Sequence, residues 1–139
     1  PINKLGSEYL SSFSWLGHHN GIKEDLTAFE NLRVTRSLLP TNDTKISSAL
    51  ETIGLKGYRH TAARNFSAGM KRRLGLARLL LADTPLWILD EPQSALDKSG
   101  IQLFEQLATT HLDNGGMIVM TSHHDVGFHA NYLQHLRLN

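Results

Sequence analysis

Two short apolar runs, each followed at once by polar residues, form the clearest hydrophobic pattern of the sequence. Residues 86–89 read Leu-Trp-Ile-Leu and precede two acids, and residues 117–120 precede Thr121. Short continuous runs of this kind are typical of strands covered on both faces of a parallel sheet. Earlier in the chain, residues 9–17 alternate apolar and polar positions, as a strand with one buried face does. Residues 132–138 are the last predicted strand.

Helical periodicity and capping residues fill the first long segment between these strands. Residues 27–30 read Thr-Ala-Phe-Glu, a capping box that starts a helix predicted to reach about residue 39. Residues 45–53 have one apolar face and are closed by Gly54, which predicts a second helix. We therefore expect a small helical insert at about residues 24–65.

A third helix is predicted over residues 68–82, where leucines lie around much of the circumference. This distribution favours a helix that is buried between two layers. Asp97 can cap a fourth helix, which two consecutive glycines end. The order of strands and helices predicts an α/β sheet, whose core we expect in residues 9–17 and 83–139.

The length and composition of the chain narrow the possible functions. Its 139 residues are enough for one domain with a core of its own. A formal net charge of +1 gives no reason to expect nucleic acid or an anionic membrane as the main partner. The absence of cysteine excludes disulfides and thiolate metal sites. No apolar run approaches the roughly 20 residues that span a bilayer, and no signal peptide is recognisable, so a role at a membrane would come through a partner.

The acids after the first apolar run, Asp90 and Glu91, are the strongest candidates for chemistry. Consecutive side chains of an extended chain point in opposite directions, so the two carboxylates are expected to do different work. One can hold a magnesium ion while the other activates a water molecule. Pro92 has no N–H and favours an extended Glu91, which predicts the end of the strand there. The alternative is a strand that ends in a solvated acidic turn.

The start of the third predicted helix has features that suit an anion. Ser67 is a good N-cap, and the small residues after it leave the first-turn amides open. Gly69 costs a helix about 1 kcal/mol relative to alanine. The basic residues 71–73 lie at the end of the helix where its dipole disfavours cations. Together these features indicate an anionic partner, and an ordinary cap beside a solvated basic face is the competing explanation.

Four motifs resemble those of the ABC-transporter ATPases, and they follow one another along the chain in the order that the family has. Residues 66–73 (Phe-Ser-Ala-Gly-Met-Lys-Arg-Arg) are similar to the signature motif, and residues 86–91 are similar to the Walker B strand. Residues 94–97 (Ser-Ala-Leu-Asp) match the D-loop, and His123 stands where the family has its switch histidine. The signature keeps the serine and second glycine but has phenylalanine, alanine and methionine where leucine, glycine and glutamine are usual. The resemblance implies a P-loop NTPase sheet of the RecA-like, ABC ATPase kind.

The same resemblance implies ATP and Mg²⁺ as ligands and gives roles to three residues after the strands. Asp90 would position the magnesium ion. Glu91 would activate the attacking water. His123 would contact the γ-phosphate.

Three further matched residues would act between two copies of the subunit. By the resemblance, Ser67 and Gly69 would bind the γ-phosphate held by the opposite copy. Asp97 would link the two sites. The implied assembly therefore contains a second copy of the ATPase subunit.

The loop after the first predicted strand contains two adjacent histidines. His18 occupies the position of a family glutamine that touches magnesium and responds to the membrane partner. Histidine accepts a hydrogen bond or binds a metal only when it is neutral, so sensitivity to pH is a possible consequence. His18 and His19 can equally be solvated loop residues.

One part of the family pattern is absent from the sequence. NTPases of this class hold phosphates with the amides and lysine of Gly-x-x-x-x-Gly-Lys-Ser/Thr, and the sequence has no Gly-Lys dipeptide. Residues 1–139 therefore resemble an N-terminally truncated ABC ATPase domain. We expect this polypeptide alone to bind ATP poorly and to hydrolyse it negligibly, whereas the intact parent protein would be the ATPase.

A narrower resemblance is carried by residues 16–32. Their Leu-Gly-His-His-Asn-Gly-Ile-Lys sequence, with the landmarks that follow it, is similar to the ATP-binding subunit of the bacterial haem exporter in cytochrome c maturation. Trp87 fits the same group, whereas Asn20 stands where proline is expected. The resemblance implies a peripheral protein on the cytoplasmic face of the inner membrane, bound to membrane-spanning transporter subunits. The transported or released species stays open.

Two other classes of function use the same sequence features. The ATPase of another ABC exporter, or a soluble ABC ATPase, would carry the same four motifs. A non-catalytic fragment could use the helical insert to dock a partner. Co-purification of the intact protein with membrane subunits would distinguish these classes.

Overall fold

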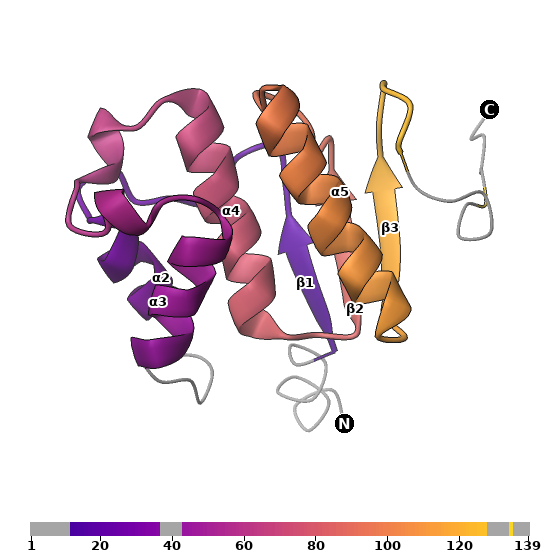
Figure 1. The fold of residues 1–139 in the computed structure, drawn as a ribbon, viewed down its shortest axis with the longest axis horizontal. Coiled ribbons are helices and arrows are strands. Elements are labelled where there is room, and N and C mark those ends of the chain that lie inside the picture. The colour runs from indigo at the N-terminus through magenta and orange to yellow at the C-terminus, as the bar shows by residue number, and fades with distance from the viewer. Residues whose placement is uncertain (1–11, 37–42, 128–133, 135–139) are drawn as a thin grey trace, which may run out of the picture.

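The computed structural model describes residues 12–36, 43–127 and 134, and these form a parallel sheet beside a group of helices (Figure 1). Its strands and helices, in chain order, are β1 (Phe13–Leu16), α2 (Ala28–Arg36), α3 (Asp43–Thr52), η1 (Lys56–Tyr58), η2 (Ala63–Asn65), α4 (Ala68–Ala82), β2 (Leu86–Asp90), α5 (Lys98–Asp113) and β3 (Met117–Thr121). Every helix among these residues is too short or too polar to cross a lipid bilayer.

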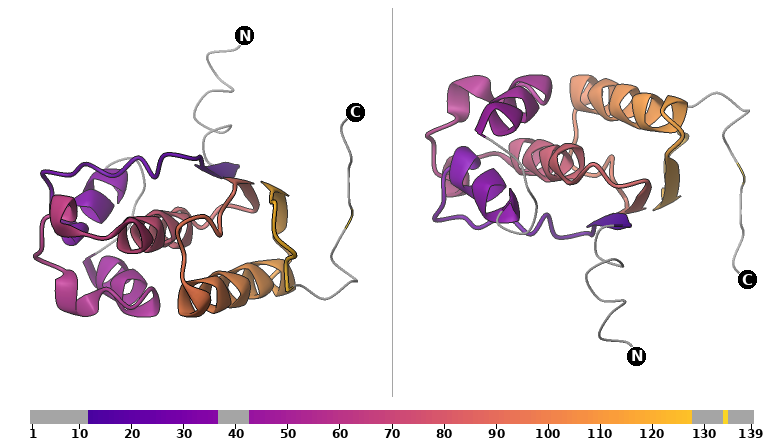
Figure 2. Two further views of the ribbon diagram at one scale, coloured as in Figure 1. Left: turned by 90° about the horizontal axis from the view of Figure 1, so that it is seen from above. Right: turned by 90° about the horizontal axis from the view of Figure 1, so that it is seen from below.

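The sheet has the order β1-β2-β3, and both pairs of neighbours are parallel. The predicted α/β fold with a parallel sheet is therefore confirmed. Helices α4 and α5 lie on the same face of the sheet, as the two views of Figure 2 show. The apolar cluster under them is completed by side chains from every strand: Leu16, Trp87, Leu89, Ile118 and Met120.

The other face of the sheet is open over the described residues. Trp15, Met117 and Val119 alternate with the buried positions of β1 and β3, and each is 61% exposed. In β2, Leu86 and Ile88 point to the same open face and are half-buried. The prediction that residues 86–89 are covered on both faces is thus wrong for the structure described here, because only one layer of helices lies against the sheet.

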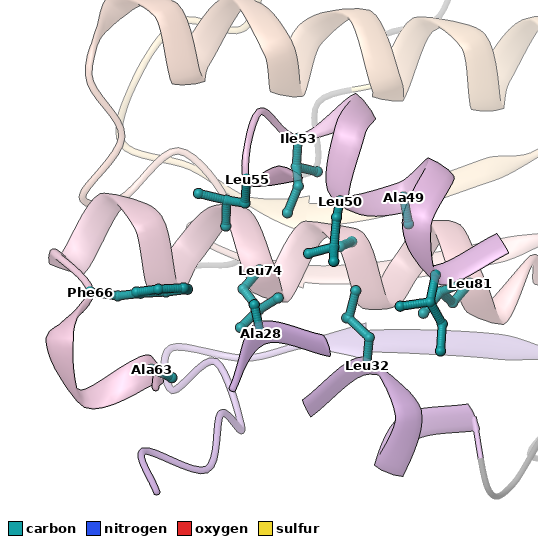
Figure 3. Close-up of a cluster of buried hydrophobic side chains, with 12 residues drawn as sticks. Ala28, Leu32, Ala49, Leu50, Ile53, Leu55, Ala63, Phe66, Leu74 and Leu81 are labelled. Carbon is teal, nitrogen blue, oxygen red and sulfur yellow. The ribbon is translucent and has the colours of Figure 1, made fainter. Parts of the chain in front are cut away.

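Helices α2, α3 and α4 enclose a second apolar cluster (Figure 3). Leu32 of α2, Leu50 of α3 and Leu74 of α4 are all at most 1% exposed and lie in its centre. Helix α4 belongs to both clusters, since Leu76 and Leu79 pack under the sheet instead. The predicted burial of this helix between two layers is confirmed, and it makes α4 the element that joins the helical group to the strands.

The boundaries of several elements differ from the sequence predictions. The strand expected over residues 9–17 is β1, which begins at Phe13, and residues 9–11 lie outside the described residues. Helix α2 ends at Arg36, and the predicted continuation to residue 39 also lies outside them. The same holds for the predicted strand over residues 132–138, apart from residue 134.

The capping box before α2 is formed as its sequence predicts. The Glu30 N–H donates to Thr27 Oγ1 over 3.1 Å, and the Thr27 N–H donates to Glu30 Oε2 over 2.8 Å. These bonds lower the pKa of Glu30, the backbone bond from Thr27 being the largest cause. Helix α2 therefore starts at Ala28 with two of its first-turn donors satisfied.

Replacement of Thr27 by alanine is expected to lower the free energy of unfolding of the full-length protein by about 1 kcal/mol, because the Glu30 amide loses its acceptor. Chemical denaturation followed by circular dichroism measures the change. Thr52→Ala is the matched control, since the Thr52 hydroxyl only donates to Ser48 O within α3 and satisfies no free helix donor. Equal losses for the two variants would contradict a capping role.

Candidate functional site

The carboxyl ends of β2 and β3 place Asp90 beside Thr121. These residues are register partners, and Thr121 Oγ1 donates to Asp90 Oδ1 over 2.6 Å. The bond fixes a half-buried carboxylate at the sheet edge where open α/β sheets bind ligands. Magnesium in phosphate-handling sites is held by one or two carboxylates, with water and phosphate as the remaining ligands. Asp90 fits that requirement.

Glu91 follows the strand in a left-handed backbone conformation. Its φ is +48°, so the prediction of an extended Glu91 before Pro92 is wrong. The conformation is held from both sides: the Glu91 N–H donates to Thr121 O over 3.2 Å and to Thr121 Oγ1 over 3.1 Å, and the Glu91 carbonyl accepts from Arg72 over 2.7 Å. Such a backbone is unfavourable for a residue with a side chain and persists only where its surroundings impose it.

The Glu91 carboxylate contacts His123. His123 Nε2 lies 3.1 Å from Glu91 Oε1, and the His123 backbone N–H donates to Glu91 Oε2 over 3.4 Å. The Glu91 side chain is 21% exposed, whereas that of His123 is 89% exposed. The imidazole therefore covers the carboxylate from the solvent side. Asp90 and Glu91 have different partners, as predicted, although Glu91 is left-handed and not extended.

A cavity of about 490 Å³ opens beside this pair. His18, Glu91 and His123 all line it, although they come from three separate segments of the chain. The parallel order of the strands explains the convergence, because the residues after β1, β2 and β3 emerge at the same edge of the sheet. Ser67 and Gly69 do not line this cavity.

The start of α4 lies against the loop that contains residues 94–97. Ser67 caps the helix, since its Oγ accepts the Met70 N–H over 3.1 Å. A Cβ at Gly69 would lie 3.0 Å from the carbonyl oxygen of Ala95. The backbone of Ala95 is left-handed, with a φ of +64°. Close packing against the loop thus gives this glycine a structural reason of its own, independent of any ligand.

The basic residues after Gly69 have partners within the protein, which account for their positions without a ligand. Their interpretation as a sign of an anionic partner stays a prediction. Lys71 Nζ pairs with Glu24 Oε1 over 2.6 Å and lowers the pKa of that carboxyl. Arg73 donates to Ile53 O over 3.2 Å and to Ser99 Oγ over 2.8 Å. The alternative of a solvated basic face is wrong, because Arg72, between them, is only 2% exposed.

Asp97 caps α5, as its position before the helix predicts. Its Oδ1 accepts the Gly100 N–H over 2.8 Å and the Ser99 hydroxyl over 3.0 Å. The bond from Gly100 is the main cause of a lowered pKa for Asp97, with contributions from Ser99 and Arg73. Arg73 Nη2 lies 3.4 Å away, so this carboxylate joins the start of α5 to α4.

Three residues in contact with the predicted site are not among the residues that the sequence pattern assigns to it. Thr121 is the polar end of a predicted strand, and Arg72 is part of a basic run. Asn20 was noted as a departure from proline, without a role, and its Oδ1 accepts from Arg72 Nη1 over 2.8 Å. A signal for Arg72 was present, because it lies on the same helix face as Leu76 and Leu79, which face the sheet.

Comparison with known proteins places these features in one family. The family model described as "ABC transporter" matches residues 5–94. The cytochrome c biogenesis ATP-binding export protein CcmA of Nitrosospira multiformis is 44% identical over 139 residues, which are 99% of this chain and 68% of that protein. The protein of the same name from Methylococcus capsulatus is 47% identical over 120 residues, which cover 85% of this chain and 58% of that protein.

Solved structures give the same picture for the fold. An ATP-binding subunit of an ABC transporter superposes with a TM-score of 0.78 at 22% identity, over 88% of this chain and 52% of that one. A dimeric ATP-binding cassette in a post-hydrolysis state, bound to ADP and Pi, superposes with a TM-score of 0.73 at 19% identity, over 89% of this chain and 57% of that one. The chain thus spans about half the length of these structures.

Proposed function

This chain belongs to the ABC transporter family of ATP-binding proteins, and from that premise we propose that it carries the hydrolytic residues of an ATPase that serves cytochrome c biogenesis, in the step of haem export. The observation that carries the proposal is the contact of Glu91 with His123, 3.1 Å apart, beside the bond between Thr121 and Asp90. The names of the similar curated proteins supply the pathway.

Within this proposal, the residues at the carboxyl edge of the sheet divide the hydrolytic work. Asp90 would hold Mg²⁺, which neutralises phosphate charge when it is bound. Glu91 accepts the proton of the attacking water, and its left-handed backbone fixes where the carboxylate points. His123 orients that carboxylate through Nε2 and its backbone N–H. Its ring, which is 89% exposed, would contact the terminal phosphate. His18, on the same cavity, takes the place of the family glutamine.

The signature residues are assigned to a second copy of the subunit. Ser67 and Gly69 do not line the cavity of Glu91, which supports a role on a nucleotide held elsewhere. The first turn of an α-helix has amides without an acceptor inside the helix, and such amides suit an anion. Asp97 joins α4 to α5 next to this helix start, so it would link the sites of the two copies. The dimeric form of the similar ATP-binding cassette supports this arrangement.

Binding of ATP is assigned to the intact protein. The phosphate-binding Gly-x-x-x-x-Gly-Lys-Ser/Thr loop is not in this sequence. We propose that another part of the same ATPase domain supplies it. The open sheet face of Trp15, Met117 and Val119 is where that polypeptide would pack, since 61% exposure of each side chain leaves apolar area uncovered. The 139 residues alone would bind ATP weakly.

Affinity purification of the full-length protein from detergent-solubilised membranes tests the proposed function. Membrane-spanning subunits are expected to be retained, because the proposed function serves export across the membrane in which they lie. Glu91→Gln is the matched control, since it alters hydrolysis and leaves the surface of the protein unchanged. Recovery of the protein only in the soluble fraction, free of membrane subunits, would favour a soluble ABC ATPase and contradict the proposal.

A further inference from the structure

Arg72 is a buried cation beside the site, and three of its hydrogen bonds go to the segment that carries the acids. Its Nη2 donates to Asp90 O over 2.8 Å and to Glu91 O over 2.7 Å. Its Nε donates to Pro92 O over 3.3 Å. A guanidinium is planar and rigid, so these bonds hold consecutive carbonyls at the end of β2 in a fixed arrangement.

The remaining donors of Arg72 go to the loop after β1. Its Nη1 donates to Gly17 O over 2.8 Å and to Asn20 Oδ1 over 2.8 Å. A guanidinium has five N–H donors, and each of them is now used. The acceptors of Nη1 belong to the loop that contains His18, and the acceptors of Nη2 belong to Asp90 and Glu91. One rigid guanidinium therefore connects this loop to the acidic segment.

The buried charge of Arg72 is solvated without an ion pair to a carboxylate. Burial lowers the pKa of Arg72, while the nearby Asp90 and Glu91 act in the opposite direction. None of its hydrogen bonds goes to a carboxylate oxygen, so carbonyl and amide oxygens solvate the buried charge. Buried charges are costly to solvate, and an apolar residue of similar size is often as good for stability alone. Stability alone therefore does not explain an arginine at this position, and we look for its role in the geometry of the residues that it bonds.

The geometry in question is that of Glu91. Its backbone has a φ of +48°, and its neighbours must impose this conformation. Thr121 holds the N–H side, and Arg72 is the only side-chain partner that the structure gives for the carbonyl among the described residues. Release of the carbonyl would let the peptide rotate and swing the carboxylate away from His123.

We propose that Arg72 is a positioning residue for the reaction: it sets the direction of the Glu91 carboxylate and ties it to the loop at residues 17–20. Movement of that loop is then transmitted to Glu91 through the guanidinium. The inference rests on the proposed function, since it takes Glu91 as the residue that activates water.

Steady-state hydrolysis by the full-length protein tests the proposal through Arg72→Lys. A lysine keeps the charge, but its single nitrogen cannot reach acceptors on both loops. We expect kcat to fall about 100-fold, the scale for a misplaced catalytic group, with the Kd of ATP nearly unchanged. For Arg72→Ala, added guanidinium is expected to restore part of kcat. Hydrogen exchange is expected to accelerate in both variants at the amides of residues 91–95, apart from Pro92, which has no amide hydrogen.

Arg78→Lys is the matched control. Arg78 is a second arginine on α4, half-buried where Arg72 is buried, and burial lowers its pKa too. It donates to Asn20 O over 2.8 Å and to Thr35 Oγ1 over 3.1 Å, and neither bond goes to β2 or to the residues after it. This variant is expected to keep a kcat close to that of the wild-type protein, with no change in exchange at residues 91–95.

Three results would overturn the role of Arg72. The first is a wild-type kcat for Arg72→Lys. The second is a parallel loss of kcat, ATP affinity and thermal stability without rescue by guanidinium, which is the pattern of structural damage. The third is unchanged hydrogen exchange at residues 91–95. A wild-type protein that hydrolyses no ATP would instead contradict the proposed function, and hydrogen exchange would still test Arg72.

Discussion

Replacement of Glu91 by glutamine in the full-length protein is expected to lower the rate of ATP hydrolysis by about 10²–10⁴-fold, the range that a general base contributes. The amide keeps the size of the side chain but cannot accept the proton of the attacking water. Its contacts with His123 can persist in part, because the His123 backbone N–H still finds a carbonyl oxygen. ATP binding is therefore expected to stay close to that of the wild-type protein.

A phosphate-release assay combined with equilibrium nucleotide binding measures both quantities. Glu51→Gln is the matched control, since that carboxylate lies on the surface, is 66% exposed and only pairs with Lys56 over 3.3 Å. It is expected to leave hydrolysis and binding unchanged. Retention of most turnover in Glu91→Gln would remove Glu91 from the role of base, and equal loss of binding and turnover would indicate a distorted site instead.

Replacement of Phe104 by alanine is expected to lower the free energy of unfolding by about 3–5 kcal/mol. Phe104 is 0% exposed and lies in the cluster that holds α5 against the sheet. Its neighbours include Trp87 and Leu89, so the cavity left by the smaller side chain would open beneath the strand that carries the acids. A loss of this size removes a large part of the stability of a typical domain.

Chemical denaturation of the full-length protein measures this loss. Val34→Ala is the control, since Val34 on α2 is 45% exposed and a smaller side chain there leaves no closed cavity. Its effect is expected to stay within about 0.5 kcal/mol. Comparable losses for both variants would mean that the cluster under the sheet contributes less to stability than its burial indicates.

Much of the fold followed from local signals in the sequence. Ser67 and Asp97 cap α4 and α5 as expected, because an N-cap needs only a side-chain oxygen and the amides that follow it. The strand before Asp90 was evident from its apolar run. The family resemblance gave Glu91 and His123 roles at one nucleotide, and parallel strands bring both residues to one edge of the sheet.

Contacts between distant residues were beyond reach of the same signals. Arg72 bonds to Gly17, 55 positions away in the sequence, and nothing in a basic run tells a buried guanidinium from a solvated one. The left-handed conformation of Glu91 is imposed by tertiary partners and opposes the local preference set by Pro92. The apolar pattern of a strand shows that it can be covered on both faces, but it does not show which segments pack against each face. The open sheet face could therefore not be predicted from that pattern.

A crystal structure of the full-length protein with Mg²⁺ and a non-hydrolysable ATP analogue tests the central claim most directly. The account predicts Asp90 on the magnesium ion, directly or through water, and a Glu91 carboxylate about 3 Å from the water in line with the terminal phosphate. Carboxylates of Asp90 and Glu91 that both turn away from the nucleotide would contradict it.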